Sequence, residues 1–139
     1  MLSIIAIGLM LSLVTTFMHA LSMLAGFKAL LILHVDRWDR NRRLVRETTV
    51  CALVLMLSLT SLLEAVIWAL AYRQLGAFAD FDTALYFSMV TFTTLGYGDI
   101  TLEPRWQLLS ALEAANGIMM FGWTTALLFA FVQRVYRRG

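Results

Sequence analysis

Three long stretches that carry very little charge limit the fold of this chain more than any other feature. They cover residues 1–34, 49–72 and 105–133. An α-helix rises about 1.5 Å per residue, so about 20 apolar residues cross the hydrocarbon core of a bilayer, which is about 30 Å thick. Each stretch is long enough to do so. We therefore predict an all-α membrane protein with three transmembrane helices, embedded in the lipid bilayer of the cell membrane.

Composition supports this class. Hydrophobic residues make up 60% of the chain and charged residues 14%, which is too apolar for an ordinary soluble domain. A cleaved signal peptide is the alternative for the first stretch, but no Lys or Arg precedes it and it is too long for a signal peptide. The sequence shows no nucleophile–base pair, phosphate loop or Cys/His cluster, so we expect neither an enzyme nor a bound cofactor.

A fourth apolar segment, residues 82–93, is too short to cross a membrane. Asp82 stands where an N-cap is expected, and a helix of this length covers about half of a bilayer. Irregular backbone at membrane depth is tolerated only inside protein or beside water. We therefore predict a re-entrant helix whose end delivers the next residues to mid-membrane, where several chains surround them.

The residues that follow are Thr93-Thr94-Leu95-Gly96-Tyr97-Gly98-Asp99. Glycines at alternate positions allow φ of either sign, so that successive carbonyl groups can turn toward one axis. A ring of such carbonyls replaces the water shell of a cation. The Thr94 hydroxyl offers one further oxygen, and we expect Tyr97 to pack outward and hold the ring open. A Gly-Tyr-Gly-Asp surface turn is the alternative interpretation.

This heptapeptide resembles the selectivity-filter signature of the potassium-channel superfamily. The order span, short helix, filter and span over residues 49–134 is similar to the two-helix pore module of that family, and Ala84-Leu85-Tyr86-Phe87-Ser88 resembles its aromatic pore helix. Residues 1–34 are extra to the module. They lack regularly spaced arginines and so do not resemble a voltage sensor.

The resemblance implies a homotetrameric, potassium-selective channel. K⁺ would pass along a filter formed by residues 94–98, held by the backbone carbonyls of Thr94, Leu95, Gly96 and Tyr97, with Gly98 ending the strand and Thr93 and Asp99 supporting it. Leu95 replaces the commoner Val. Val90 stands where some relatives carry a Glu that bonds the residue equivalent to Asp99, so that bond is unavailable here.

Two other functions stay open at this point. One is a weakly selective cation channel, against which Tyr97 argues, because relatives that lose selectivity often lack the aromatic residue. The other is a non-conducting membrane subunit or sensor that keeps the filter as a scaffold. The sequence does not say whether a regulatory subunit binds or which stimulus opens the channel.

Polar residues inside the spans cost free energy in a bilayer unless they have hydrogen-bonding or charged partners. For Glu64 we expect a hydrogen bond to the short helix, with pH sensing as the alternative. We expect Glu113 to pack behind the filter rather than line the pore. For His19 we expect a neutral imidazole that hydrogen-bonds a neighbouring helix, the alternative being a functional group.

Other residues of the last two spans have expected places. Asn116 either faces an aqueous cavity or hydrogen-bonds between helices. Gly117 stands where the family carries a hinge glycine, and with Gly122 it permits close packing or bending, which makes both candidates for gating. At the ends of the spans we expect aromatic residues at the membrane boundary and a proline at the first helical position: Trp68, Tyr72 and Pro104.

Basic residues predict the orientation. Residues 35–48 form a basic linker, either a loop or a short interfacial helix, and residues 135–139 form a short basic tail. The excess of Arg and Lys on cytoplasmic loops places both in the cytoplasm and the N-terminus on the extracellular or periplasmic side. Asp99 then lies at the external face. Acidic residues interleave with the linker's arginines, so we expect no nucleic-acid partner.

Overall fold

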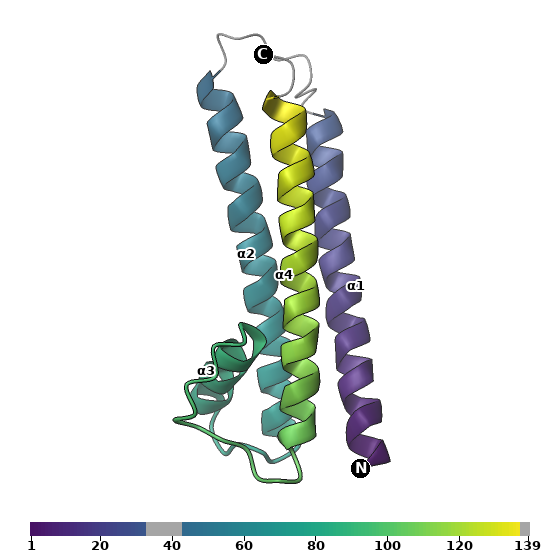
Figure 1. Cartoon of the computed structure of the whole chain (residues 1–139), viewed down its shortest axis with the longest axis vertical. Coiled ribbons are helices and arrows are strands. Elements are labelled where there is room, and N and C mark those ends of the chain that lie inside the picture. Colours follow the sequence, from purple (N-terminus) through teal and green to yellow (C-terminus); the bar gives the residue numbers. More distant parts are fainter. Residues whose placement is uncertain (33–42, 137–139) are drawn as a thin grey trace.

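The described residues form three long helices that run nearly side by side and a short helix that packs against one end of them, as Figure 1 shows. The computed structural model describes residues 1–32 and 43–136. Its helices are α1 (Leu2–Ile32), α2 (Arg43–Gln74), α3 (Phe81–Phe92) and α4 (Gln107–Tyr136). The described residues contain no strand, and the prediction of an all-α fold is confirmed.

Three of the helices are long and apolar enough to cross a membrane, over Leu2–Ala29, Glu47–Gln74 and Gln107–Gln133. The chain is therefore a multi-pass membrane protein. Most of the predicted linker, residues 35–42, and most of the tail, residues 137–139, lie outside the described residues. The remaining part of the linker, residues 43–48, forms the first turns of α2 rather than a loop or a separate interfacial helix.

The N-cap of α3 is Asp80, so the predicted N-cap Asp82 is wrong. Asp80 has extended backbone, with φ −113° and ψ 155°, and its carboxylate accepts a 2.7 Å hydrogen bond from the Thr83 backbone N–H. This bond lowers the pKa of Asp80. Asp82 instead occupies the first turn, where a negative charge is favourable beside the helix N-terminus.

Helix α4 begins at Gln107, so the placement of Pro104 at its first position is wrong as well. Pro104 lies in a turn that the Trp106 backbone N–H closes by donating to the Glu103 carbonyl, at 2.8 Å. Proline suits the second position of such a turn because its φ is already fixed near −65°. The turn brings the chain back into the bundle three residues later than the sequence suggested.

The end of α3 lies about a third of the way along α4. The 12 residues of α3 make a helix about 18 Å long. Its last residue, Phe92, contacts Gly117, which is about 15 Å from the start of α4. A Cβ atom built on Gly117 would be 1.9 Å from the Phe92 carbonyl oxygen, so only glycine allows this approach.

Aromatic side chains fill the space between α2 and α3. Trp68 and Tyr72 are fully buried there, so their predicted position in a membrane-boundary belt is wrong. Tyr72 packs edge-on against Phe87, with ring centroids 5.4 Å apart, and Phe78 covers both rings. These residues bury their rings because α3 packs against the end of α2 where they stand.

We expect Gly117→Ala to weaken the packing of α3 on α4. The new methyl group would meet backbone rather than a flexible side chain, so the overpacking cost should reach about 1–3 kcal/mol or more. The measurement is the free energy of unfolding in detergent micelles. Gly122→Ala is the matched control on the same helix, because no atom of the chain lies within 4 Å of its added Cβ. Equal effects of the two variants would contradict the contact.

Candidate functional site

The segment predicted to form the filter, residues 94–98, begins with the C-terminal cap of α3. The Thr94 N–H donates to the Thr91 carbonyl and the Leu95 N–H to the Val90 carbonyl, each at 2.9 Å. This pair of bonds is a Schellman motif, in which the residue after the cap has left-handed backbone and is usually glycine. Thr94 takes that place here, with φ 61°.

Helix α2 ends in the same motif with the usual residue. The Gly76 N–H donates to the Arg73 carbonyl and the Ala77 N–H to the Tyr72 carbonyl, and Gly76 has φ 73°. A β-branched residue in this conformation is an outlier that costs of order 1–3 kcal/mol. Such strain gathers at functional sites, which marks Thr94 as a residue of interest.

Left-handed backbone then recurs at every second residue. Gly96 has φ 54° and Gly98 has φ 77°, while no other residue described between 93 and 99 has a positive φ. Alternation of right- and left-handed residues turns successive N–H groups to one side of a strand, which leaves the carbonyls on the other side. Positive φ at every second residue is the part of this pattern that the segment shows.

The side chains of this segment lie open. All residues from Thr93 to Asp99 are exposed, including the two large ones, Leu95 at 54% and Tyr97 at 68%. Thr93 bonds back to α3, since its hydroxyl donates to the Met89 carbonyl at 2.7 Å. Between Thr93 and Asp99, the side chains of residues 94–98 therefore have little cover from their own chain.

Asp99 has a partner that the sequence did not indicate. The Tyr86 hydroxyl donates to Asp99 Oδ2 at 2.7 Å, and this bond ties the outer end of the segment to α3. Tyr86 lies four residues before Val90, the position considered above. The sequence does show a tyrosine on α3 that could donate a hydrogen bond. Which residue accepts that bond depends on how the segment after α3 folds back along the helix.

Glu113 of α4 is fully buried against α3 and α2. Its Oε1 is 2.5 Å from the Ser88 hydroxyl of α3, and its Oε2 accepts a 2.6 Å bond from the Tyr72 hydroxyl of α2. The Ser88 hydroxyl also lies 2.7 Å from the Ala65 carbonyl. Glu113 thus packs against α2 and α3, and its expected place behind the filter stays a prediction. Ser88 and Tyr72 were not singled out as its partners.

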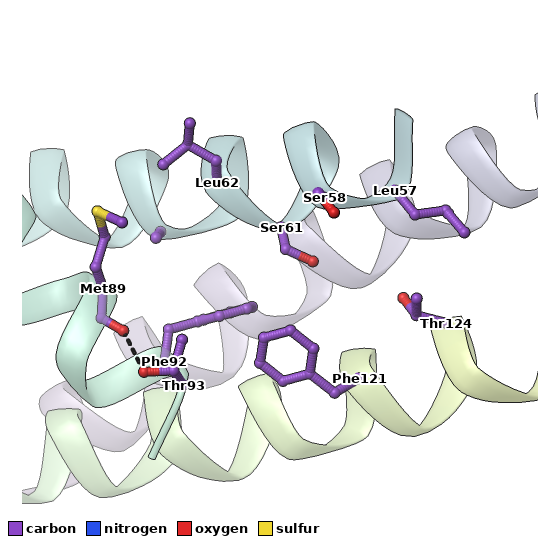
Figure 2. A pocket seen from close by; sticks show the side chains of 10 residues that line it. Leu57, Ser58, Ser61, Leu62, Met89, Phe92, Thr93, Phe121 and Thr124 are labelled. Atoms are coloured by element: carbon purple, nitrogen blue, oxygen red, sulfur yellow. Dashed lines mark hydrogen bonds between the residues drawn. The ribbon is translucent and has the colours of Figure 1, made fainter. Parts of the chain in front are cut away.

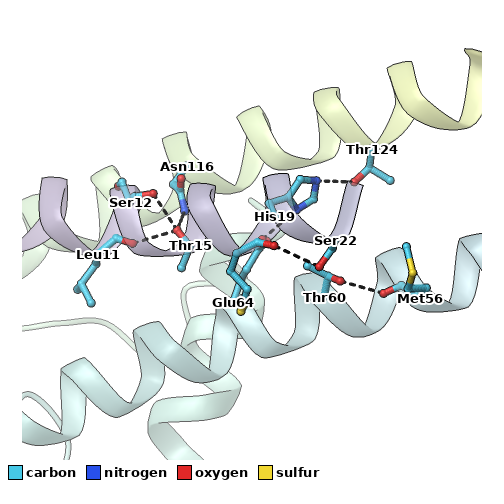
Figure 3. A network of polar contacts seen from close by, with 11 residues as sticks. Leu11, Ser12, Thr15, His19, Ser22, Met56, Thr60, Glu64, Asn116 and Thr124 are labelled. Carbon is cyan, nitrogen blue, oxygen red and sulfur yellow. Dashed lines mark hydrogen bonds and ion pairs between the residues drawn. The ribbon is translucent and has the colours of Figure 1, made fainter. Parts of the chain in front are cut away.

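Glu64 contacts α1, not the short helix, so its predicted partner is wrong. Its Oε1 is 2.9 Å from Nδ1 of His19, and both side chains are fully buried. The other ring nitrogen of His19 is 3.2 Å from the Thr124 hydroxyl of α4, and Trp123 stacks on the ring. Figure 3 shows how this imidazole joins three helices near their middle.

Asn116 makes a hydrogen bond between helices, which is one of the two alternatives left open for it. Its side-chain amide donates to the Thr15 hydroxyl of α1 at 2.8 Å (Figure 3). The next residue is Gly117, whose missing side chain admits α3. Neither contact tests a gating role for Asn116, Gly117 or Gly122.

A pocket of about 330 Å³ lies beside the end of α3, as Figure 2 shows. Apolar groups from α2, α3 and α4 line most of it, among them Leu62, Phe92 and Phe121. Ser58 and Ser61 of α2 add hydroxyl groups to its wall. The pocket contains no group of metal-binding residues, because none exists among the described residues.

Comparisons with known proteins place this site in a family. A family model described as "Ion channel" matches residues 50–134, which include α2, α3, the segment 94–98 and α4 up to Arg134. The match covers more than half of the chain. No curated protein and no solved structure was found to match it.

We expect His19 and Glu64 to depend on each other for stability. Replacing either one by Leu leaves its partner's polar atom buried without a hydrogen bond, at a cost of about 1–3 kcal/mol. The double variant should cost less than the sum, with a coupling of about 0.5–3 kcal/mol. The measurement is the free energy of unfolding in detergent micelles. Strictly additive effects would show that the pair contributes nothing.

Proposed function

Because the chain belongs to the ion-channel family, we propose that it is a potassium-selective channel that conducts K⁺ passively across the membrane. The ion passes along the segment 94–98. Backbone carbonyls of Thr94, Leu95, Gly96 and Tyr97 replace its water shell, Gly98 ends the strand, and Thr93 and Asp99 hold the two ends. The chain is then a channel and not an enzyme, and K⁺ is its cargo.

One observation carries this proposal: left-handed φ at Thr94, Gly96 and Gly98, directly after the end of the short helix α3. The alternation supports a row of carbonyls that face one way. Left-handed backbone at Thr94 costs conformational free energy. Alignment of the carbonyl oxygens from the first residue of the strand would give a reason for this strain. The exposed surface turn that the sequence left open would need no such strain.

The exposure of the segment supports a ring of four chains. One chain supplies one strand, and a filter of this kind surrounds the ion with four. Non-helical backbone inside a membrane must be buried in protein or beside water, and Leu95 and Tyr97 are open in the single chain. We therefore propose a homotetramer with cyclic symmetry, in which neighbouring chains cover these side chains.

The arrangement of the helices is also suited to a cation. The C-terminal end of a helix carries partial negative charge, and α3 points this end toward the middle of the bundle (Figure 1). Figure 1 also shows that the loop between α3 and α4 and the N-terminus lie at one end of the bundle and the C-terminal end of α4 at the other. With the basic linker in the cytoplasm, the segment opens to the extracellular or periplasmic side.

We expect Gly98→Ala to abolish K⁺ flux or the preference for K⁺ over Na⁺ in liposomes that contain the purified protein. Gly98 has φ 77° and open space around its missing Cβ, so alanine brings backbone strain without a clash. That strain costs of order 1–2 kcal/mol in each chain and acts on the coordinating carbonyls. Membrane insertion and the tetrameric mass should persist, because α1, α2 and α4 are unchanged.

Gly76→Ala is the matched control. Gly76 has φ 73° and also no atom within 4 Å of an added Cβ, but it lies between α2 and α3. It should keep flux and selectivity. If Gly98→Ala assembles and passes K⁺ with unchanged selectivity, residues 94–98 are not the filter. Equal K⁺ and Na⁺ flux through the unaltered protein would indicate a weakly selective channel, and no flux under varied pH, Ca²⁺ and voltage a non-conducting subunit.

We expect Tyr86→Phe to shorten the lifetime of the conducting state. The change keeps the ring and removes only the hydroxyl that donates to Asp99, so the outer end of the segment loses its tie to α3. In single-channel or flux recordings, activity should decline faster after opening, with initial K⁺ selectivity retained. Asp99→Asn, whose side-chain oxygen can still accept the bond, should be milder. An unchanged time course in Tyr86→Phe would rule out this role.

A further inference from the structure

The Ser88 hydroxyl lies between two oxygen atoms that accept hydrogen bonds. It is 2.7 Å from the Ala65 carbonyl oxygen and 2.5 Å from Oε1 of Glu113. A serine hydroxyl has one proton to donate, and a carbonyl oxygen has none. Ser88 can therefore donate across only one of these two contacts.

A third contact completes the cluster. The Tyr72 hydroxyl is 2.6 Å from Oε2 of Glu113. Three oxygen–oxygen contacts at hydrogen-bond distance require three protons, but Ser88 and Tyr72 together supply two. If Glu113 were ionised, one of the three contacts would have no proton. Two oxygen atoms would then face each other with lone pairs at hydrogen-bond distance, which is repulsive.

We propose that Glu113 is protonated and acts as a neutral positioning residue for α3. Its proton is on Oε1 and is donated to Ser88, Ser88 donates to the Ala65 carbonyl, and Tyr72 donates to Oε2. Each contact then holds one proton. A proton on Oε2 instead would be shared with Tyr72 and would still leave one Ser88 contact without a proton, so the geometry selects Oε1.

The surroundings favour a neutral carboxyl. Glu113, Ser88 and Tyr72 are fully buried, and no Lys, Arg or His of the described chain forms an ion pair with Glu113. Among the residues that the structure describes, Tyr72 is the titratable group that hydrogen-bonds Glu113. An unpaired charge within a span costs several kcal/mol by the lower estimates, whereas a neutral carboxyl with all its hydrogen bonds avoids that cost.

With this proton in place, a continuous chain of hydrogen bonds joins α3 to both α4 and α2. Hydrogen bonds run from α4 through Ser88 to the backbone of α2, one helical turn before Phe92 ends α3. This tie fixes the place where the segment 94–98 begins. Its consequence for conduction rests on the proposed function, whereas the protonation itself does not.

Infrared spectroscopy of the protein in liposomes tests the protonation. At neutral pH the unaltered protein should show the C=O stretching band of a protonated carboxyl group, and Glu113→Gln should remove it. Glu64→Gln is the matched control, because it changes the other buried carboxyl of the spans and should leave the Glu113 band in place. If the spectrum at neutral pH contains no protonated-carboxyl band that Glu113→Gln removes, the proposal is overturned.

Rescue by the neutral isostere is the second test. A glutamine at position 113 can donate to Ser88 and accept from Tyr72, so Glu113→Gln should assemble with a melting temperature near that of the unaltered protein. Glu113→Leu leaves both hydroxyls without this partner and should melt at a lower temperature. A Gln variant as impaired as the Leu variant would show that the ionised form is required. Neither result depends on K⁺ flux, so failure of the proposed function would be seen separately.

Discussion

A helix too short to cross a bilayer, packed between helices that are long enough to do so, determines most of this structure. Hydrocarbon offers no hydrogen bonds, so the end of α3 and the irregular backbone after it must be satisfied by protein or water. The chain meets this requirement with full-length helices on two sides of α3. Glu113 of α4 and the Ala65 carbonyl of α2 hold Ser88, Gly117 admits Phe92, and the Schellman bonds close the helix end.

Much of this could be predicted from the sequence, because the length of each apolar stretch can be compared with the thickness of a membrane. The three spans and the short helix follow from that arithmetic. The glycine pattern also indicated alternating backbone, but the strained Thr94 could not be foreseen, since residue preferences favour glycine or asparagine at that place. Asp80 and Asp82 are equivalent N-cap candidates by residue type, and only backbone angles distinguish them.

Side-chain partners across helices were harder to predict. Glu64 needed a partner, but the rotation of each helix decides which neighbour it meets, and His19 is 45 residues away in the chain. The same holds for Tyr86 and Asp99, which meet only because the segment folds back along α3. Both buried carboxyls of the spans now have partners of different kinds: Glu64 has an imidazole, whereas Glu113 has two hydroxyl groups.

The contact between Gly117 and Phe92 has a mechanical consequence. It joins backbone to backbone, with no side-chain torsion in between that could absorb a displacement. A sideways shift of α4 at this level would therefore push directly on the backbone of Phe92, two residues before Thr94. Helix α1 contacts α4 at the neighbouring residue, because the Asn116 side chain donates a hydrogen bond to the Thr15 hydroxyl. Helix α1 is thus linked to the base of the segment 94–98 through two contacts, Thr15 with Asn116 and Gly117 with Phe92.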